Sequence, residues 1–505
     1  MNIKRAKQEI KDSIEAYLLR DEQGDYVIPG VRQRPILLLG APGIGKTQIM
    51  EQIARECQIG LVAYTITHHT RQSAIGLPFI THKEFGGREY AVTEYTMSEI
   101  VASVYEKMEK TGLEEGILFI DEINCVSETL APAMLQFLQC KTFGNQAIPQ
   151  GWIIVAAGNP PEYNKSVRDF DVVTMDRVKK IEVEPDYSVW KEYAQEQNLH
   201  PAVIAYLDAH PGRFYQMETT VDGKRFATPR GWEDLSELLM IYEKLGKAVD
   251  WEVVVQYIQH PKTARDFANY LELYKKYQAD YQIDQILGGR MDELLMKKTA
   301  HASFDERLSV ISLLLAKCTE AFRRTEEQDW LIQALFPRLQ NFKALLGEGG
   351  ADPAACMDQI RDDIWQEQEN KEQAELLSRK EKKLYQQLLA QVEAYGQMIR
   401  QKEARTSELA LALVRAAFDS MQDVREESVR ASGRMLEHAF DFMEAAFGDS
   451  QEMVVFVTEL NTSPVCVRFL REYECDRYYQ YNQRLLVNQA HRQLRSRIEE
   501  LKEGN

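Results

Sequence analysis

Several protein classes are excluded by what this sequence lacks. Its 505 residues contain seven cysteines and no C-x-x-C pair, which argues against a disulfide framework or a cysteine-based zinc site. It has no run of about 18 apolar residues, so we expect no membrane-spanning segment. The first residues alternate charged with apolar side chains, unlike a secretory signal peptide. We therefore expect a cytoplasmic protein with reduced thiols.

Basic residues are fewer than acidic ones. The chain has 61 Lys and Arg against 78 Asp and Glu, which gives a formal net charge of −17. Neutralising phosphate groups requires Lys and Arg, so we expect no nucleic-acid partner, although a local basic patch is compatible with this balance. Proline is scarce in the second half, since twelve of the sixteen prolines lie at or before Pro229. This predicts many turns in the first part and long helices in the rest.

The first part alternates short apolar runs with helical patterns. Helical patterns begin at Lys46, Met97, Ser127 and Asn164, and residues 3–19 have the spacing of an amphipathic helix. Buried strands that alternate with helices predict a mainly parallel sheet covered on both faces. The predicted strands are Pro35–Leu39, Gly60–Ile66, Gly116–Ile120, Trp152–Ala157 and Val178–Val183.

Strand patterns stop at Asp186, and the remaining sequence is predicted to be helical. Between Pro353 and Gly396 the chain has no glycine or proline and is rich in charged residues. Its apolar residues follow a spacing of three to four, which is typical of a helix with one buried face. A long hairpin in a helical bundle is the favoured interpretation, and an intermolecular coiled coil is the alternative.

A glycine-rich segment follows the first predicted strand and opens a helix. Glycines let the backbone curl so that several N–H groups point at one polyphosphate, and the helix N-terminus adds positive potential. The lysine is expected to reach the β- and γ-phosphates, and the threonine hydroxyl to ligate Mg²⁺. We assign this segment and the adjacent Gln48 to nucleotide binding: Gly40, Ala41, Pro42, Gly43, Ile44, Gly45, Lys46 and Thr47.

Polar residues end two later strands. Asp121 and Glu122 follow the apolar run Ile117–Ile120, at the strand end where open α/β sheets bind ligands. Asp121 is predicted to hold Mg²⁺, and Glu122 to polarise the attacking water. Asn159 ends the predicted strand that begins at Trp152, and its amide is predicted to lie beside the γ-phosphate.

These motifs together resemble those of AAA+ ATPases, specifically the MoxR-type or dynein-related branch. The matching segments are GAPGIGKT, LFIDEIN, AAGNP, MDRV and ATPRGW. The resemblance implies a P-loop α/β core with a parallel sheet (26–185), preceded by an N-terminal helix (1–25) and followed by a helical lid (186–285). Residues 286–505 match nothing in the family and are expected to form an all-helical domain for a partner or substrate.

The family resemblance also implies roles for individual side chains. Asn159 matches the sensor 1 position. Arg177 matches the arginine finger, which reaches into the neighbouring subunit's site, and Arg168 is a nearby alternative for that role. Arg230 matches sensor 2, in the lid. A guanidinium group suits these roles because it is always charged and donates hydrogen bonds in a fork.

The function implied by the resemblance is ATP hydrolysis with Mg²⁺ in a homo-oligomeric ring, with a hexamer expected. The ring would remodel or activate a protein client, and the family points to one with a von Willebrand A-type domain. Two alternatives stay open: a nucleotide-gated scaffold with slow hydrolysis, and a nucleic-acid-associated motor. The segment Pro78–Val92 predicts a hairpin around Gly86-Gly87, with Phe85 at its tip, that contacts substrate.

Overall fold

A computed structural model describes residues 1–68, 74, 76–143, 146–163, 170, 172–220, 223–347 and 352–485. The chain divides into two compact units. The first contains Met1–Val189 and Ile364–Lys383, and the second contains Trp190–Asp363 and Leu384–Asn505. The domain boundaries expected after residues 25, 185 and 285 stay predictions, since this division does not test them.

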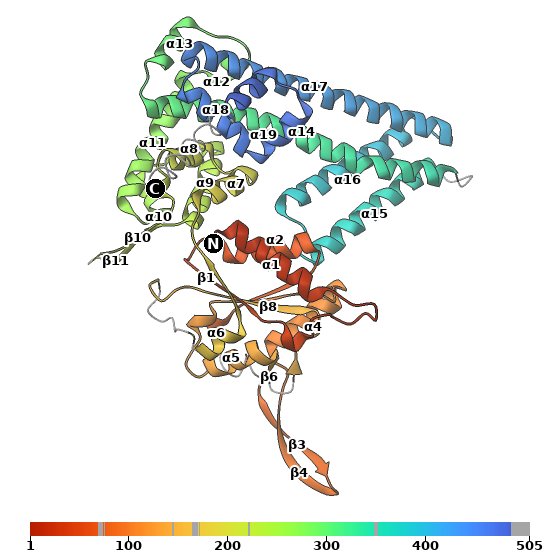
Figure 1. Cartoon of the computed structure of the whole chain (residues 1–505). Helices are drawn as coiled ribbons and strands as arrows, with labels where there is room; N and C mark the ends of the chain where they lie inside the picture. Colours follow the sequence, from red (N-terminus) through yellow and green to blue (C-terminus); the bar gives the residue numbers. More distant parts are fainter. Residues whose placement is uncertain are drawn as a thin grey trace, which may run out of the picture. The chain divides into compact units, whose positions relative to one another are not determined.

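The first unit is built on a five-stranded parallel sheet with the strand order β2-β5-β8-β1-β9 (Figure 1). All five predicted strands form, so the predicted sheet is confirmed. The strands are β1 (Ile36–Gly40), β2 (Gly60–Thr65), β5 (Gly116–Asp121), β8 (Trp152–Gly158) and β9 (Lys179–Val183). The helices are α1 (Ile3–Leu18), α2 (Lys46–Cys57), α4 (Glu99–Thr111), α5 (Ala131–Cys140) and α6 (Val172–Arg177). The helix start predicted at Asn164 lies outside the described residues.

The core of this unit lies around the central strand β8, which is buried along its whole length. Its first residue, Trp152, is 1% exposed and occupies space that two glycines leave open. A Cβ atom on Gly116 would lie 2.7 Å from the Trp152 ring, and one on Gly60 would lie 3.0 Å from it. Both distances are too short for comfortable packing, so glycine at the start of β5 and β2 allows the indole to be buried.

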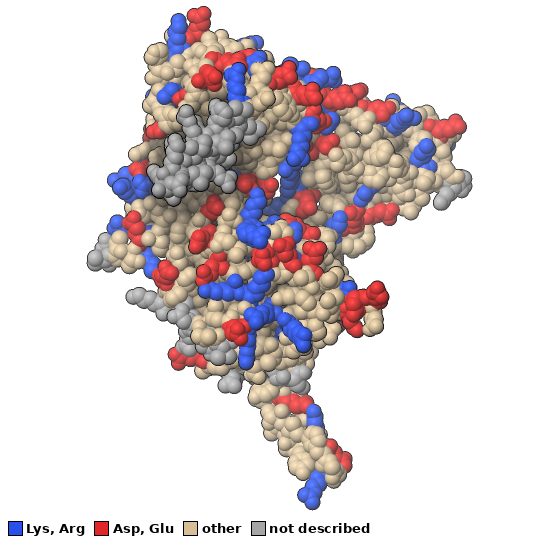
Figure 2. Space-filling model, in the orientation of Figure 1, with Lys and Arg blue, Asp and Glu red and all other residues tan. Residues whose placement is uncertain are grey.

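The predicted hairpin forms and projects from the sheet (Figure 1). It consists of β3 (Pro78–Phe85) and β4 (Arg88–Tyr95), which pair antiparallel. Gly86 and Gly87 form the turn with φ of 60° and 77°, a conformation that glycine adopts without strain. Phe85, next to the turn, is 58% exposed. Most of the hairpin surface in Figure 2 is uncharged.

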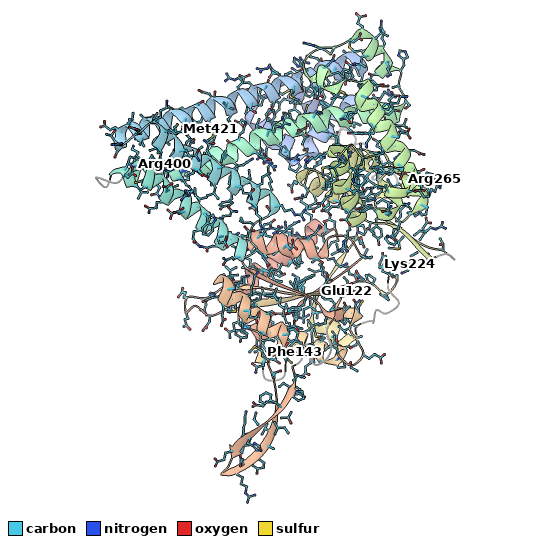
Figure 3. The ribbon with its side chains drawn as sticks, turned by 180° about the vertical axis from the view of Figure 1, so that it is seen from behind. Glu122, Phe143, Lys224, Arg265, Arg400 and Met421 are labelled. Atoms are coloured by element: carbon cyan, nitrogen blue, oxygen red, sulfur yellow. The ribbon has the colours of Figure 1, made fainter. Side chains whose placement is uncertain are left out.

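The second unit is mainly helical, but it contains a hairpin that the sequence analysis missed. Strands β10 (Gln216–Thr220) and β11 (Gly223–Ala227) pair antiparallel within the predicted lid, where only helices were expected. The sequence carries the signal, because two threonines precede an Asp-Gly pair. Threonine favours strands and Asp-Gly favours tight hairpin turns. Lys224 lies on this hairpin (Figure 3).

Long helices dominate the rest of the second unit, and α14 and α17 pack against each other (Figure 1). The described helices from the lid onward are α7 (Tyr187–Glu196), α8 (Pro201–Ala209), α9 (Pro229–Lys244), α10 (Trp251–Tyr257), α11 (Pro261–Asp280), α12 (Ile283–Leu287), α13 (Glu293–Ala300), α14 (Phe304–Gly347), α15 (Pro353–Gln373), α16 (Arg379–Gln401), α17 (Ser407–Phe447), α18 (Gln451–Thr462) and α19 (Pro464–Glu472). No single helix in the described ranges is long and apolar enough to cross a membrane. Among these residues, only α18 and α19 reach the required length and hydropathy, and only when the two are taken together as one bent pair.

The apolar face predicted for the region after Pro353 is buried along α16. Leu388, Val392 and Ile399 are each at most 2% exposed. Arg400 of α16 forms an ion pair with Asp358 of α15, so the two helices contact each other within one chain. This contact agrees with the hairpin interpretation.

A buried ionic cluster links the predicted lid to the C-terminal helices. The ammonium group of Lys191 in α7 lies 2.7 Å from Asp208 in α8 and 2.6 Å from Glu459 in α18. The Lys191 side chain is only 11% exposed. Burial opposes its charge, but the two carboxylates outweigh burial and raise the pKa of Lys191. Lys191 of α7 therefore joins α8 and α18, each of which supplies a carboxylate that neutralises its charge.

Replacing Lys191 by methionine should loosen this junction. Lys191→Met leaves two carboxylates facing each other in a buried place, and removing one partner of a buried ion pair typically costs about 3–5 kcal/mol. Hydrogen exchange should show α7, α8 and α18 opening more easily by about that amount. Lys317→Met is the control, because its partner Asp284 is 80% exposed and such a pair contributes about 1 kcal/mol or less. Equal effects of the two substitutions would contradict the structural role of the cluster.

Candidate nucleotide-binding site

The glycine-rich segment forms the turn between β1 and α2. β1 ends at Gly40 and α2 begins at Lys46. Gly43 and Gly45 have φ of 75° and 92°, which favours glycine at both positions. A Cβ atom on Gly40 would lie 2.7 Å from the carbonyl oxygen of Val183, so the turn packs closely on β9. These constraints let the loop curl tightly ahead of the α2 N-terminus.

Lys46 connects this loop to the end of β8. Its side chain is buried, and its ammonium group donates to the carbonyl oxygens of Gly40 (2.9 Å) and Ala41 (2.8 Å). It also donates to Oδ1 of Asn159, at 2.9 Å. The structure thus brings together two of the predicted site residues that are more than a hundred positions apart. A positive charge held inside a curled loop at a helix N-terminus is suited to binding an anion such as a phosphate group.

Thr47 and Asp121 form a second pair in this site. The Thr47 hydroxyl donates to Oδ2 of Asp121 at 2.9 Å, and Oδ1 of Asp121 accepts from the backbone N–H of Glu122 at 2.9 Å. A hydroxyl and a carboxylate are the oxygen ligands that Mg²⁺ prefers. The donor chemistry of this pair therefore fits the expected magnesium ion.

Glu122 lies next to Asp121, where the chain turns sharply. Its φ of 57° places the backbone in the left-handed region, which is strained for a glutamate. Its Oε2 accepts a hydrogen bond of 3.2 Å from the hydroxyl of Thr67. Figure 3 labels Glu122 at the sheet. The carboxylate is therefore held at the carboxyl edge of the sheet by a residue from another segment.

Thr67 is a site residue that the sequence analysis missed. It lies in the short helix η2 (Ile66–His68), directly after β2. β2 is the sheet neighbour of β5, so the carboxyl ends of the two strands meet at the same edge. The signal in the sequence is a hydroxyl residue directly after a predicted strand, but only the strand order of the fold places it beside Glu122.

The other predicted loop residues line the same turn. Ala41 and Ile44 are buried at 4% and 7% exposure, which anchors the loop on the core. Gln48 is exposed in the first turn of α2. Pro42 is half-buried in the loop.

The structure does not bring the two predicted arginines into the site. Within the described residues, neither of them forms a hydrogen bond with Asp121 or Glu122. Arg177 is the last residue of α6, is exposed, and donates to the side-chain oxygen of Gln139 in α5. Arg230 is exposed in the first turn of α9, in the second compact unit. Arg168, the alternative to Arg177, lies outside the described residues.

Comparison with known proteins agrees with this geometry. Residues 35–178 match the family described as AAA domain (dynein-related subfamily). No curated protein matches the sequence.

Similar solved structures include RuvB of Thermotoga maritima, described in one case as the Holliday junction branch migration motor and in two others as single-site mutants. Identity is 15–16%, TM-scores are 0.28–0.29, and the match covers 51% of this chain and 69% of the RuvB chain. TM-scores this low support no argument about this chain. Residues 35–178 are thus similar to AAA domains of the dynein-related subfamily, and their parallel sheet and glycine-rich loop form an AAA+ P-loop core.

Proposed function

We propose that the protein is an ATPase that hydrolyses ATP with Mg²⁺ at the edge of its parallel sheet. The observation that carries this proposal is a pair of hydrogen bonds from adjacent residues: Lys46 donates to Asn159, and Thr47 donates to Asp121. These four residues come from α2 and from the ends of β8 and β5. These are the groups that phosphoryl transfer requires: a cation for the phosphates, ligands for the metal and a polar group beside the γ-phosphate.

Each side chain has a distinct task in this proposal. Lys46 and the loop N–H groups bind the phosphates, and Thr47 and Asp121 hold Mg²⁺, which supplies positive charge when bound. Glu122 accepts a proton from the attacking water, and Asn159 orients that water. The Thr67 hydroxyl competes for the Glu122 carboxylate and restrains it.

Assembly completes the site in our proposal. Arg177 is exposed on α6, where a second subunit has access to it, and its guanidinium is suited to stabilise transition-state charge in a neighbouring site. We propose a homo-oligomeric ring, with a hexamer as the expected form. Arg230 of the lid would contact the nucleotide phosphates as ATP binds and the lid closes.

We further propose a MoxR-like, chaperone-like role in the cytoplasm, in which hydrolysis remodels or activates a protein client. The C-terminal helices and the exposed β3–β4 hairpin are the surfaces offered to such a client. A client with a von Willebrand A-type domain follows from the family resemblance alone.

A nucleotide-gated scaffold with slow hydrolysis is the second candidate. The hydrogen bond between Thr67 and Glu122 favours it, because a glutamate held by another side chain is a poor base for water. Hydrolysis would then be slow until a partner releases Glu122.

Glu122→Gln tests the catalytic assignment. The substitution keeps the size and the hydrogen-bonding shape of the side chain but removes its basicity, so turnover should fall about 100-fold or more. ATP affinity should stay within about twofold, since the phosphate and metal ligands remain. Steady-state ATPase assays and titration with a fluorescent ATP analogue measure the two quantities.

Glu128→Gln is the matched control, because it makes the same charge change at an exposed position in the same unit. An unchanged rate in Glu122→Gln would remove Glu122 from its role.

Thr67→Val tests the restraint on Glu122. Losing the hydroxyl frees the carboxylate, and a hydrogen bond to a charged group contributes at least about 1 kcal/mol, so the basal ATPase rate should rise about fivefold. Thr111→Val is the control, since its hydroxyl bonds only to backbone groups, the carbonyl of Lys107 and the N–H of Leu113. A lower rate in Thr67→Val would mean that the hydroxyl assists Glu122 instead of restraining it.

A further inference from the structure

The parallel sheet splits at the edge where the site lies. The pairing between β5 and β8 runs from Gly116 and Trp152 to Ile120 and Ala156. Beyond this point β5 stays paired with β2, as far as Asp121, and β8 stays paired with β1, as far as Gly158. The acidic residues therefore leave β5, and Asn159 leaves β8, just beyond the last residues that pair these two strands.

One side chain joins the two segments beyond this last pair. Asn124 lies in the short helix η3 (Ile123–Cys125), two residues after Glu122, and is 5% exposed. Its Nδ2 donates to the backbone carbonyl oxygen of Asn159 at 2.7 Å. This bond joins the segment that carries Glu122 to the end of β8, where the backbone ladder no longer does so.

Gly158 makes room for the bridge. A Cβ atom on Gly158 would lie 2.6 Å from Oδ1 of Asn124, so any other residue there would displace the amide. The Asn124 amide thus packs directly against the last residue of β8. Asn159 is held at two points, by Asn124 at its backbone and by Lys46 at its side chain.

Oδ1 of Asn124 is buried and has no hydrogen-bond partner among the described residues. A buried acceptor without a partner is destabilising, and such costs are typical of functional sites. A residue present only to fill this space would be better served by an apolar side chain. The site therefore uses the NH₂ group of the Asn124 amide, which donates to the backbone of Asn159.

We propose that Asn124 is a positioning residue that holds Asn159 across the split in the sheet, so that the Asn159 amide keeps its place beside the γ-phosphate and the attacking water. This inference rests on the proposed function, because it assigns Asn124 a role in the same hydrolysis. Asn124 acts through Asn159 and touches neither the nucleotide nor the water.

A double-mutant cycle in the full-length protein tests the proposal. Asn124→Ala should lower kcat about tenfold, because small displacements of positioning groups have large effects on rate, and should leave ATP affinity within about twofold. In an Asn159→Ala background the same substitution should lower kcat less than about twofold, since the side-chain amide that Asn124 positions is already gone. Asn124→Asp, which keeps the shape but cannot donate, should behave like Asn124→Ala.

The outcomes separate this inference from the proposed function. Equal losses of kcat in both backgrounds, or no loss in the wild-type background, would overturn the role of Asn124 while hydrolysis itself stands. A wild-type protein without ATPase activity would overturn the proposed function, and this inference with it. Asn461→Ala is the matched control, because it deletes a hydrogen-bonded amide in the second unit and should leave kcat unchanged.

Discussion

The buried ammonium group of Lys46 is the interaction on which the site depends. It binds two carbonyl oxygens of its own loop and the side chain of Asn159, and so fixes the loop against the end of β8. Only a tightly curled loop can bring those carbonyls to the lysine, which explains the left-handed glycines at 43 and 45. The same curl turns backbone N–H groups towards one point, as phosphate binding requires.

The parts of the fold that were predicted are those whose signals are local in sequence. The strand that ends at Asp121 and the loop from Gly40 to Thr47 each carry their pattern within a few residues. An apolar run between helical patterns has few alternatives to a buried parallel strand. The pairing of Thr47 with Asp121 follows once both are placed at the carboxyl edge of one sheet.

The parts that were missed depend on contacts between distant segments. Thr67 and Asn124 are single polar residues without a pattern, and only the fold shows that one holds Glu122 and the other Asn159. The same is true of Lys191, whose carboxylate partners lie in α8 and α18. The three members of this cluster lie within one compact unit, although the sequence places α18 far from α7 and α8.

Specific ATPase activity as a function of protein concentration, with Mg²⁺ present, tests the central claim most directly. The proposed site needs Arg177 of a neighbouring subunit, so activity per subunit should rise steeply from nanomolar to micromolar concentrations and then saturate. A rate per subunit that stays constant over this range in a monomeric chain would contradict the account, because one chain would then complete the site alone; a constant rate in a ring that never dissociates would agree with it. Size-exclusion chromatography at the lowest concentration distinguishes those two cases.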